Sequence, residues 1–512
     1  MLVKTYASAV HGINATSITV EVHASRGFRF HLVGLPDNAV KESQQRIISS
    51  LKTNGFEWPG MCITVNMAPA DIRKEGSAYD LPLAVGILAA SGQISARNLE
   101  TIVMMGELSL DGGLHPVKGV LPMALQARES GFRRLIVPEA NAREAAVVKG
   151  LEVYGLGHLR EVVDMLEEKT TPGPVYIDLE AEFEREGNRY DVDFSDVKGQ
   201  ENVKRALEIA AAGGHNVIMV GPPGAGKTML ARRLPTIVPP LSLEEALETT
   251  KIHSVAGKME SNASLMTCRP FRSPHHTISD VALVGGGSYP QPGEISLAHN
   301  GVLFLDELPE FKRTVLEVMR QPLEDRVITI SRARFAVEYP ASFMLVASMN
   351  PCPCGYYNHP DKPCVCTPGV VQKYLHRISG PLLDRIDIHI EVVPVPFEKL
   401  GDIREAEPSR AIRERVTEAR KLQEIRFKEE NGVFCNAQMT SRMLRKYCKL
   451  TESGHLILKN AMDKLGLSAR AYDRILKVSR TIADLEKSPD ILPSHLAEAI
   501  QYRNLDREGW AG

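Results

Sequence analysis

His215-Asn216-Val217-Ile218-Met219-Val220-Gly221-Pro222-Pro223-Gly224-Ala225-Gly226-Lys227-Thr228 is the stretch that decides the fold of this chain. An apolar run leads into the pattern G-x-x-x-x-G-K-T, the phosphate-binding loop of nucleotide triphosphatases. Glycines let successive backbone N–H groups form a concave nest around a phosphate. We therefore expect a buried strand over 216–220, then the loop, then a helix over 227–234 whose N-terminus faces the anion.

The loop predicts an ATP site that uses Mg²⁺. Lys227 is expected to reach the β- and γ-phosphates, and the Thr228 hydroxyl is expected to hold Mg²⁺. The backbone that would surround the phosphates belongs to Gly221, Pro222, Pro223, Gly224, Ala225 and Gly226.

Two further strands are expected to bring polar groups to this site. The run 301–305 is apolar and ends in Asp306 and Glu307. The first acid suits a Mg²⁺ contact, and the second suits polarising the attacking water. A third strand, 343–349, ends at Asn350, whose amide would orient that same water; Asn is also an ordinary turn residue.

Length and composition exclude several classes of protein. A chain of 512 residues predicts about three or four domains with their own cores. Its 61 basic and 63 acidic residues give a net charge of -2, so nucleic-acid binding would depend on local patches. No uninterrupted apolar run reaches membrane-spanning length, and the N-terminus lacks a signal-peptide pattern. We expect a cytoplasmic protein with no membrane partner.

Changes of composition along the chain divide it into four regions and indicate an α/β protein whose C-terminal region is helical. Residues 1–168 alternate β-rich runs, such as 17–22 and 62–66, with helical patterns such as 38–54. Residues 169–193 hold a Pro-Gly break and a charged tether. Residues 194–396 form the expected parallel-sheet nucleotide core, and 397–512 form a helical lid.

Together these features resemble the AAA+ ATPases. Gln200, the phosphate loop, the two acids and Asn350 follow the order of that family's motifs. Residues 382–387 resemble the arginine-finger segment of the branch that includes minichromosome-maintenance helicases and the small magnesium-chelatase subunit, and 468–472 resemble its second sensor. The resemblance implies that Arg385 meets the γ-phosphate of a neighbouring subunit in a homo-oligomeric ring, a hexamer, and that Arg470 is the sensor. Arg377 competes for the finger role, and a helix-terminal salt bridge is the alternative for Arg385.

The resemblance narrows to the magnesium-chelatase-like ComM/YifB proteins of bacteria. It is carried by residues 269–277 (Arg-Pro-Phe-Arg-Ser-Pro-His-His-Thr), the Gly285-Gly286-Gly287 insert, and 301–312. It implies a DNA translocase or helicase that promotes branch migration in natural transformation or recombination, with DNA and recombination proteins as partners. The alternatives are a metal-insertion motor of the magnesium-chelatase type and an ATP-regulated protein-remodelling adaptor.

Residues 70–81, 106–108 and 116–121 resemble the Lon protease domain. The resemblance places the nucleophile position on Ala78 and the lysine position on Leu121. Ser77 and Lys118 lie nearby but out of register, and geometry decides reactivity. We expect a Lon-like α+β fold without peptidase activity; peptidase activity from Ser77 and Lys118 is the alternative.

Four of the eight cysteines crowd into the loop 352–366 as C-x-C-x9-C-x-C, with His359 between the halves. Four thiolates would form a closed tetrahedral zinc site, and the alternative is a loop of reduced cysteines. The zinc ligands would be Cys352, Cys354, Cys364 and Cys366.

An alternating segment, 326–337, predicts two strands around a polar turn, where related helicases carry a pore hairpin. Arg332 and Arg334 near its tip would contact DNA phosphates without regard to sequence. A solvated hairpin end is the alternative, and the insert 279–294 is a second pore candidate.

Overall fold

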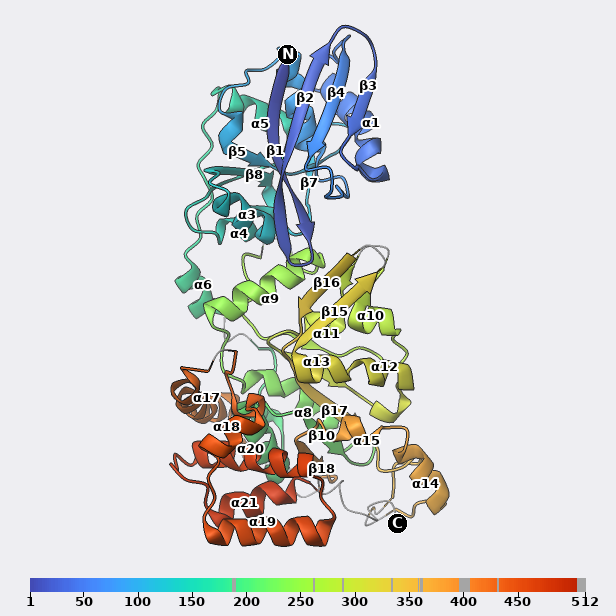
Figure 1. Ribbon diagram of the computed structural model, residues 1–512, viewed down its shortest axis with the longest axis vertical. Helices are drawn as coiled ribbons and strands as arrows, with labels where there is room; N and C mark the ends of the chain where they lie inside the picture. The colour runs from blue at the N-terminus through green and yellow to red at the C-terminus, as the bar shows by residue number, and fades with distance from the viewer. Residues whose placement is uncertain are drawn as a thin grey trace.

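A computed structural model describes residues 1–186, 190–260, 263–287, 290–332, 335–357, 359, 362–395, 406–430 and 432–503. The elements are stacked along one long axis (Figure 1). An N-terminal α/β part lies at one end, a second α/β part lies in the middle, and a group of helices lies at the other end. The mixed α/β class with a helical C-terminal region is as predicted.

The N-terminal part is built on a seven-stranded mixed sheet in the order β3-β4-β2-β1-β5-β8-β9. Its long strands β1 and β2 pair antiparallel over their full length, from Leu2↔His23 to His11↔Asn14. The all-buried helix α2 packs on this sheet, and its apolar side chains complete the core. The strands are β1 (Leu2–His11), β2 (Asn14–Ser25), β3 (Phe30–Val33), β4 (Cys62–Ala68), β5 (Ile102–Met104), β8 (Arg134–Pro138) and β9 (Glu152–Leu156), beside the small ribbon of β6 (Glu107–Leu108) and β7 (Leu114–His115). The helices are α1 (Asn38–Thr53), α2 (Asp80–Ala90), α3 (Val120–Glu129), α4 (Glu139–Ala146) and α5 (Leu159–Leu166).

The middle part contains a five-stranded parallel sheet in the order β11-β14-β17-β10-β18. Its three central strands are buried at every position, which explains why each is apolar throughout except at Ser348 of β17. Because the strands are parallel, their carboxyl ends share one edge, and ligand sites of open parallel sheets form at such edges. The strands are β10 (Val217–Val220), β11 (Phe271–Arg272), β14 (Val302–Leu305), β17 (Met344–Met349) and β18 (Ile388–Glu391).

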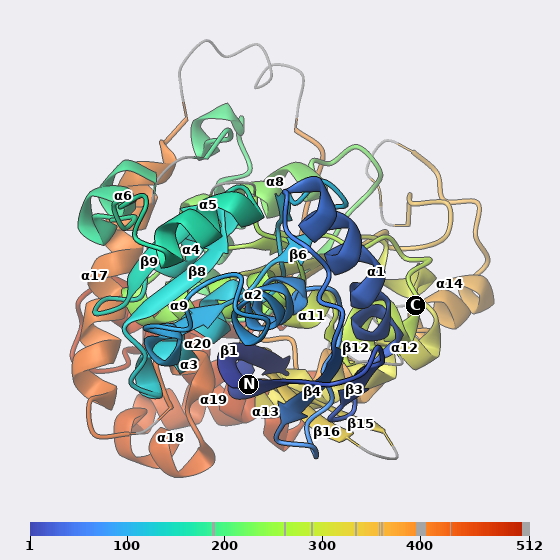
Figure 2. The same ribbon diagram turned by 90° about the horizontal axis from the view of Figure 1, so that it is seen from above.

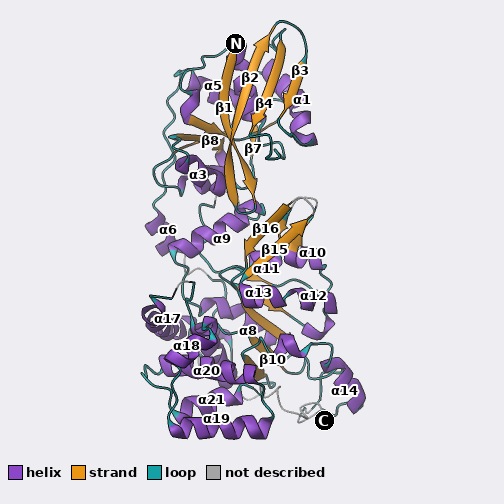
Figure 3. Ribbon diagram, in the orientation of Figure 1, coloured by secondary structure: helices purple, strands orange, loops and turns teal. Residues whose placement is uncertain are grey.

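Two β-hairpins belong to this core, and the longer one projects toward the N-terminal part (Figure 3). In the longer one, β15 (Val327–Arg332) pairs with β16 (Phe335–Pro340) from Val327↔Pro340 to Arg332↔Phe335. The shorter one joins β12 (Gly285–Gly286) to β13 (Gln291–Pro292). The helices of the core are α7 (Glu201–Gly213), α8 (Lys227–Arg233), α9 (Leu243–Val255), α10 (Asp280–Val284), α11 (Glu294–Leu297), α12 (Arg313–Val318), α13 (Arg320–Asp325), α14 (Pro368–Leu375) and α15 (Gly380–Leu383).

The C-terminal helices share a core with helix α7 and the strand that precedes the phosphate loop. His215, next to β10, is fully buried and contacts Asp387 Oδ2 at 3.3 Å and Thr481 Oγ1 at 2.8 Å. Thr481 belongs to α20, so a buried polar contact joins the C-terminal helices to the sheet. The helices are α17 (Ser409–Phe427), α18 (Ser441–Tyr447), α19 (Glu452–Leu465), α20 (Ala469–Leu485) and α21 (Pro493–Gln501).

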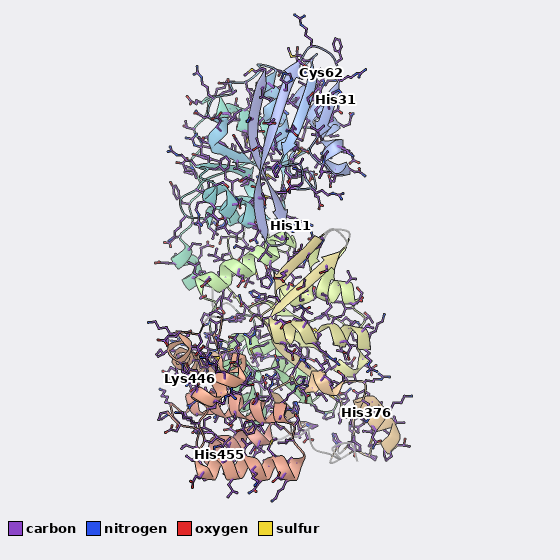
Figure 4. All side chains as sticks on the ribbon, viewed as in Figure 1. His11, His31, Cys62, His376, Lys446 and His455 are labelled. Carbon is purple, nitrogen blue, oxygen red and sulfur yellow. The ribbon has the colours of Figure 1, made fainter. Side chains whose placement is uncertain are left out.

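Described residues of the N-terminal part and of the core contact one another at their junction. The segment expected to be a tether contains helix α6 (Leu179–Glu186), whose Glu182 pairs with Arg143 and accepts a hydrogen bond from Ser264. Gly119 N donates to Ser254 O at 3.1 Å. The end of the β1–β2 hairpin, marked by His11 in Figure 4, reaches the core, and the view from above shows the N-terminal sheet lying over it (Figure 2).

A hollow of about 840 Å³ opens at this junction. Its walls include Ser77, Glu75 and Lys118 from the N-terminal part and Gly286 and Val337 from the two hairpins. Ser77 and Lys118, the alternative peptidase residues, therefore face the hairpins of the nucleotide core.

Candidate functional site

The phosphate loop connects β10 to α8 at the carboxyl edge of the parallel sheet. Gly224 and Gly226 have φ values of 81° and 89°, in the left-handed region that favours glycine. At Gly221 the constraint is space, because a Cβ would lie 2.2 Å from the carbonyl oxygen of Val392. The strand and helix begin and end within one residue of the predicted bounds.

Lys227 is held inside this loop and only 8% of it is exposed. Its ammonium donates to Gly221 O at 2.6 Å, Pro222 O at 3.0 Å and Asn350 Oδ1 at 3.1 Å. Burial lowers the pKa of Lys227, and the charges of Asp306 and Glu307 oppose that shift. These three contacts hold the ammonium inside the loop. A bound phosphate would take the place of some of these neutral oxygens as its hydrogen-bond acceptor.

Asp306 stands at the end of β14 and gathers three donors. Its Oδ2 accepts from Thr228 Oγ1 at 2.8 Å, and its Oδ1 accepts from Ser348 Oγ and from Glu307 N at 3.1 Å. A hydroxyl and a carboxylate in contact offer the oxygen ligands that Mg²⁺ prefers. The residues present therefore fit a Mg²⁺ ion.

Glu307 and Asn350 are the other two polar residues that the sequence predicts at this edge of the sheet. Glu307 has a left-handed backbone, with φ 53° and ψ 51°, and its side chain is 55% exposed. Its Oε2 lies 3.6 Å from Nδ1 of His276. Asn350 follows β17 directly, and its amide oxygen reaches the lysine, so the predicted residues 227, 228, 306 and 350 meet at one point.

The predicted arginines lie away from that point. Arg385 pairs with Glu324 and donates to the carbonyl of Pro381, and its side chain is 11% exposed. Arg470 pairs with Asp384 at 3.0 Å, and Arg377 pairs with Glu310 at 2.9 Å with 54% of its side chain exposed. In the single chain Arg385 therefore forms a salt bridge, which is the alternative role that the sequence left open for it.

The four loop cysteines meet as the sequence predicts. The sulfur of Cys352 lies 3.3 Å from Cys354 and 3.7 Å from Cys364, and that of Cys354 lies 3.5 Å from Cys364. All four sulfurs lie within 4.8 Å of one another. A tetrahedron with Zn–S bonds of about 2.3 Å has edges of about 3.8 Å, so these residues fit a zinc ion.

The cysteine loop touches the phosphate loop. Gly355 has a φ of 84°, and a Cβ added to it would lie 2.6 Å from Pro223 Cδ. Any side chain at Gly355 would push against the loop that holds the phosphates.

The remaining predicted positions are placed as follows. Leu121 is fully buried, and its N–H donates to Glu144 Oε1 at 2.8 Å. Ser77 Oγ donates to Glu107, while the hydrocarbon stem of Lys118 packs on Gly257. Arg332 ends β15 but its side chain lies outside the described part, as does all of Arg334.

Sequence reasoning missed Ser348 and His276. Ser348 is a lone hydroxyl in an otherwise apolar strand, and that break in the pattern is its signal. His276 lies in the segment 269–277, which carries the family resemblance, but its spacing in the sequence does not predict a contact with Glu307.

Comparison with known proteins agrees with this geometry. Residues 193–400 match the family described as magnesium chelatase, subunit ChlI; residues 20–141 match subunit ChlI of Mg-chelatase; and 406–503 match its C-terminal region. The chain is 46% identical over 506 residues to the uncharacterized protein YifB of Escherichia coli, covering 98% of this chain and 96% of that protein. The chain belongs to the ComM/YifB family of magnesium-chelatase-like AAA+ ATPases.

Two further proteins that are similar to this chain are informative. Competence protein ComM of Haemophilus influenzae is 46% identical over 511 residues, covering 98% of this chain and 97% of that protein. Lon protease 2 of Bacillus subtilis is 30% identical over 147 residues, or 28% of this chain and 26% of that protein. Among the described helices, none is both long and apolar enough to cross a bilayer.

Proposed function

We propose that this protein is a ring-forming, Mg²⁺-dependent ATPase that moves along DNA and promotes branch migration during natural transformation or recombination. The observation that carries the proposal is the meeting of residues 227, 228, 306 and 350 at one sheet edge, in a chain similar along its length to a competence protein. The functional units are residues 1–168, a linker over 169–193, the core over 194–396 and the lid over 397–512.

In this proposal each polar group has one task. Lys227 neutralises the β- and γ-phosphates, while Thr228 and Asp306 hold the Mg²⁺ that supplies charge stabilisation when bound. Glu307 accepts a proton from the attacking water, and Asn350 orients that water. Arg385 of one subunit completes the site of its neighbour, and Arg470 reports the nucleotide state through its helix α20.

The DNA part of the proposal is supported by the position of the two hairpins. The β15–β16 and β12–β13 hairpins pack on each other, because Tyr339 Oη donates to Pro290 O at 2.8 Å. Arg332 is the last residue of β15, and Arg334 follows it by two positions in the sequence. A strand passing through the ring would meet these arginines, whose charges suit phosphates of any sequence.

The N-terminal part is proposed to be a non-peptidase scaffold that binds partners. Leu121 is buried and offers no base, and the hydroxyl of Ser77 is committed to Glu107. Zinc is proposed for the cysteine loop, where it would replace a hydrophobic core as the stabilising element.

The test uses the purified full chain, with ATP hydrolysis and junction unwinding measured in parallel. We expect forked DNA and Holliday junctions to stimulate hydrolysis and to be remodelled, and Glu307→Gln to abolish both activities. The pair Arg332→Ala and Arg334→Ala should weaken DNA binding and reduce the slope of log affinity against log salt by about 2.

The matched control removes two exposed arginines of the C-terminal helices, Arg410 and Arg442. This double variant loses the same charge, so an equal loss of DNA binding would exclude the hairpin as the contact. If no DNA stimulates hydrolysis, the DNA motor is wrong. Stimulation by a folded protein would then identify a remodelling adaptor, and stimulation by a porphyrin with large partner subunits a metal-insertion motor.

A further inference from the structure

The hollow at the junction of the N-terminal part and the core carries an excess of acidic side chains. The carboxylates that line it are those of Asp37, Asp71, Glu75 and Glu107. The basic residues that line it are Arg73, Lys118 and His11. Arg73 is already paired with Glu75 at 3.5 Å, and the hydrocarbon stem of Lys118 packs on Gly257. A ligand that enters the hollow therefore meets more negative than positive charge.

Two buried hydroxyl groups in the same hollow lack hydrogen-bond partners. Ser8 is fully buried, and its Oγ has no partner among the described residues. Tyr79 is 3% exposed, and its hydroxyl forms no hydrogen bond with a described residue. Both residues line the hollow, and burial, with the charges of Glu75 and Asp37, raises the pKa of Tyr79. Because a buried hydroxyl without a partner costs free energy, the two groups indicate a ligand with polar atoms.

The carboxylates of the hollow are too dispersed to bind one metal ion. Among the described residues, only the four loop cysteines bring three or more possible metal ligands within 4.8 Å of one another. The same carboxylates would repel the phosphates of a nucleic acid. The ligand that the charges favour is therefore a cation whose positive groups are spaced apart.

Apolar side chains lie between these polar groups. They include Val10, Met105, Met123, Val255 and Val337. The volume of about 840 Å³ is that of a site for a small organic ligand. A flexible hydrocarbon chain that carries several ammonium groups would match both the apolar side chains and the separated carboxylates.

We propose that the junction hollow binds an aliphatic amine with several protonated nitrogens. Its ammonium groups would donate to the carboxylates of Glu75 and Asp71 and to the hydroxyl of Tyr79. Its methylene groups would lie against the apolar side chains. Because Gln291 and Val337 of the two hairpins also line the hollow, the bound amine would contact both the N-terminal part and the core.

This chemistry has two sources, a free polyamine and the lysine side chains of a partner protein. The test is isothermal titration calorimetry of the full-length protein at low salt and pH 8, above the pKa of about 7 for Glu75. Spermidine and an acetylated tri-lysine peptide are titrated separately. We expect saturable binding of one molecule per chain, and the ligand with the lower dissociation constant identifies the source.

Two variants remove groups that the amine would contact. Glu75→Gln combined with Asp71→Asn should weaken binding about tenfold or more, because two charged acceptors are lost. Tyr79→Phe keeps the ring but lacks the hydroxyl and should weaken binding about tenfold, the lower end for a hydrogen bond to a charged group.

The matched control is Glu100→Gln combined with Glu129→Gln. These exposed carboxylates of the N-terminal part do not line the hollow, so the control loses the same charge and should bind as the wild type does. The melting temperature of each variant without ligand shows whether it folds. If the Glu75 and Asp71 double variant does not fold, the affinity of Tyr79→Phe decides.

The absence of saturable binding with both ligands would overturn the inference. So would an equal loss of affinity in the control, because the amine would then bind general surface charge. Wild-type affinity in Tyr79→Phe and in the Glu75 and Asp71 double variant would place the amine outside the hollow. The titration uses neither ATP nor DNA, so its result does not depend on the proposed motor.

Discussion

Asn350 Oδ1 accepts a hydrogen bond of 3.1 Å from Lys227 Nζ, which joins the end of β17 to the start of α8. The same ammonium is bonded to two loop carbonyls, so it is supported on the protein side by three oxygens. An amide in this position can both hold the lysine and present its N–H groups to a water molecule.

Asn350→Ala should separate binding from chemistry. We expect kcat to fall about 10- to 100-fold, because the water loses an orienting group, while the nucleotide dissociation constant changes by less than about threefold. Fluorescent-nucleotide titration and steady-state hydrolysis give the two numbers. Lys227→Ala is the comparison, since it should lose binding as well. An equal loss of affinity in Asn350→Ala would mean that the amide only supports the lysine.

A mixing experiment decides which arginine completes the neighbouring site. Arg385→Ala and Lys227→Ala are each expected to be inactive alone, but mixed rings should recover part of the activity, because some interfaces then hold both residues. Arg377→Ala, mixed in the same way, is the matched comparison. Recovery with Arg377→Ala and none with Arg385→Ala would assign the finger to residue 377, which is the more exposed in the single chain.

The fold class could be predicted from local pattern and was confirmed. An apolar run of β-rich residues before a phosphate loop implies a parallel sheet, and such a sheet brings Asp306 and Asn350 to the loop because their strands end at one edge. The contact between Glu307 and His276 could not be predicted, since it depends on where the chain runs after β11, the strand that pairs with β14. The same holds for Gly355 against Pro223, because a sequence does not reveal which loop a cysteine cluster will touch.

The cysteine loop should hold one zinc ion per chain. We expect Cys364→Ser to lose the metal and to lower the rate of hydrolysis several-fold, because Gly355 packs on Pro223 and a loosened loop no longer supports it. Plasma mass spectrometry of the dialysed protein measures the metal. Cys62→Ser, in β4 and outside the cluster, is the control. Unchanged metal content and hydrolysis in Cys364→Ser would refute both the zinc site and its coupling to the loop.

Stability of the junction should depend on pH through Glu75. Partial desolvation of a side chain that is still 37% exposed, with the charge of Asp37, raises the pKa of Glu75 from 4.5 to about 7 despite Arg73. The folded state then binds this proton more tightly than the unfolded state, so stability declines as pH rises from 4.5 through 7.

Glu75→Gln should therefore raise the melting temperature at pH 8 by about 1–2 °C and leave it unchanged near pH 4.5. Differential scanning calorimetry at both pH values is the measurement, with the exposed Glu129→Gln as control. A gain of equal size at both pH values would show that the charge of Glu75 is not responsible.

The buried imidazole of His215 lies just before β10, the strand that leads into the phosphate loop. It contacts Asp387, the residue before β18, and Thr481 on α20. Arg474, on the same helix, pairs with Asp387 at 3.0 Å. A tilt of α20 would therefore also displace the start of β10. A substitution at this junction is therefore expected to disturb the C-terminal helices and the strand that leads into the phosphate loop together.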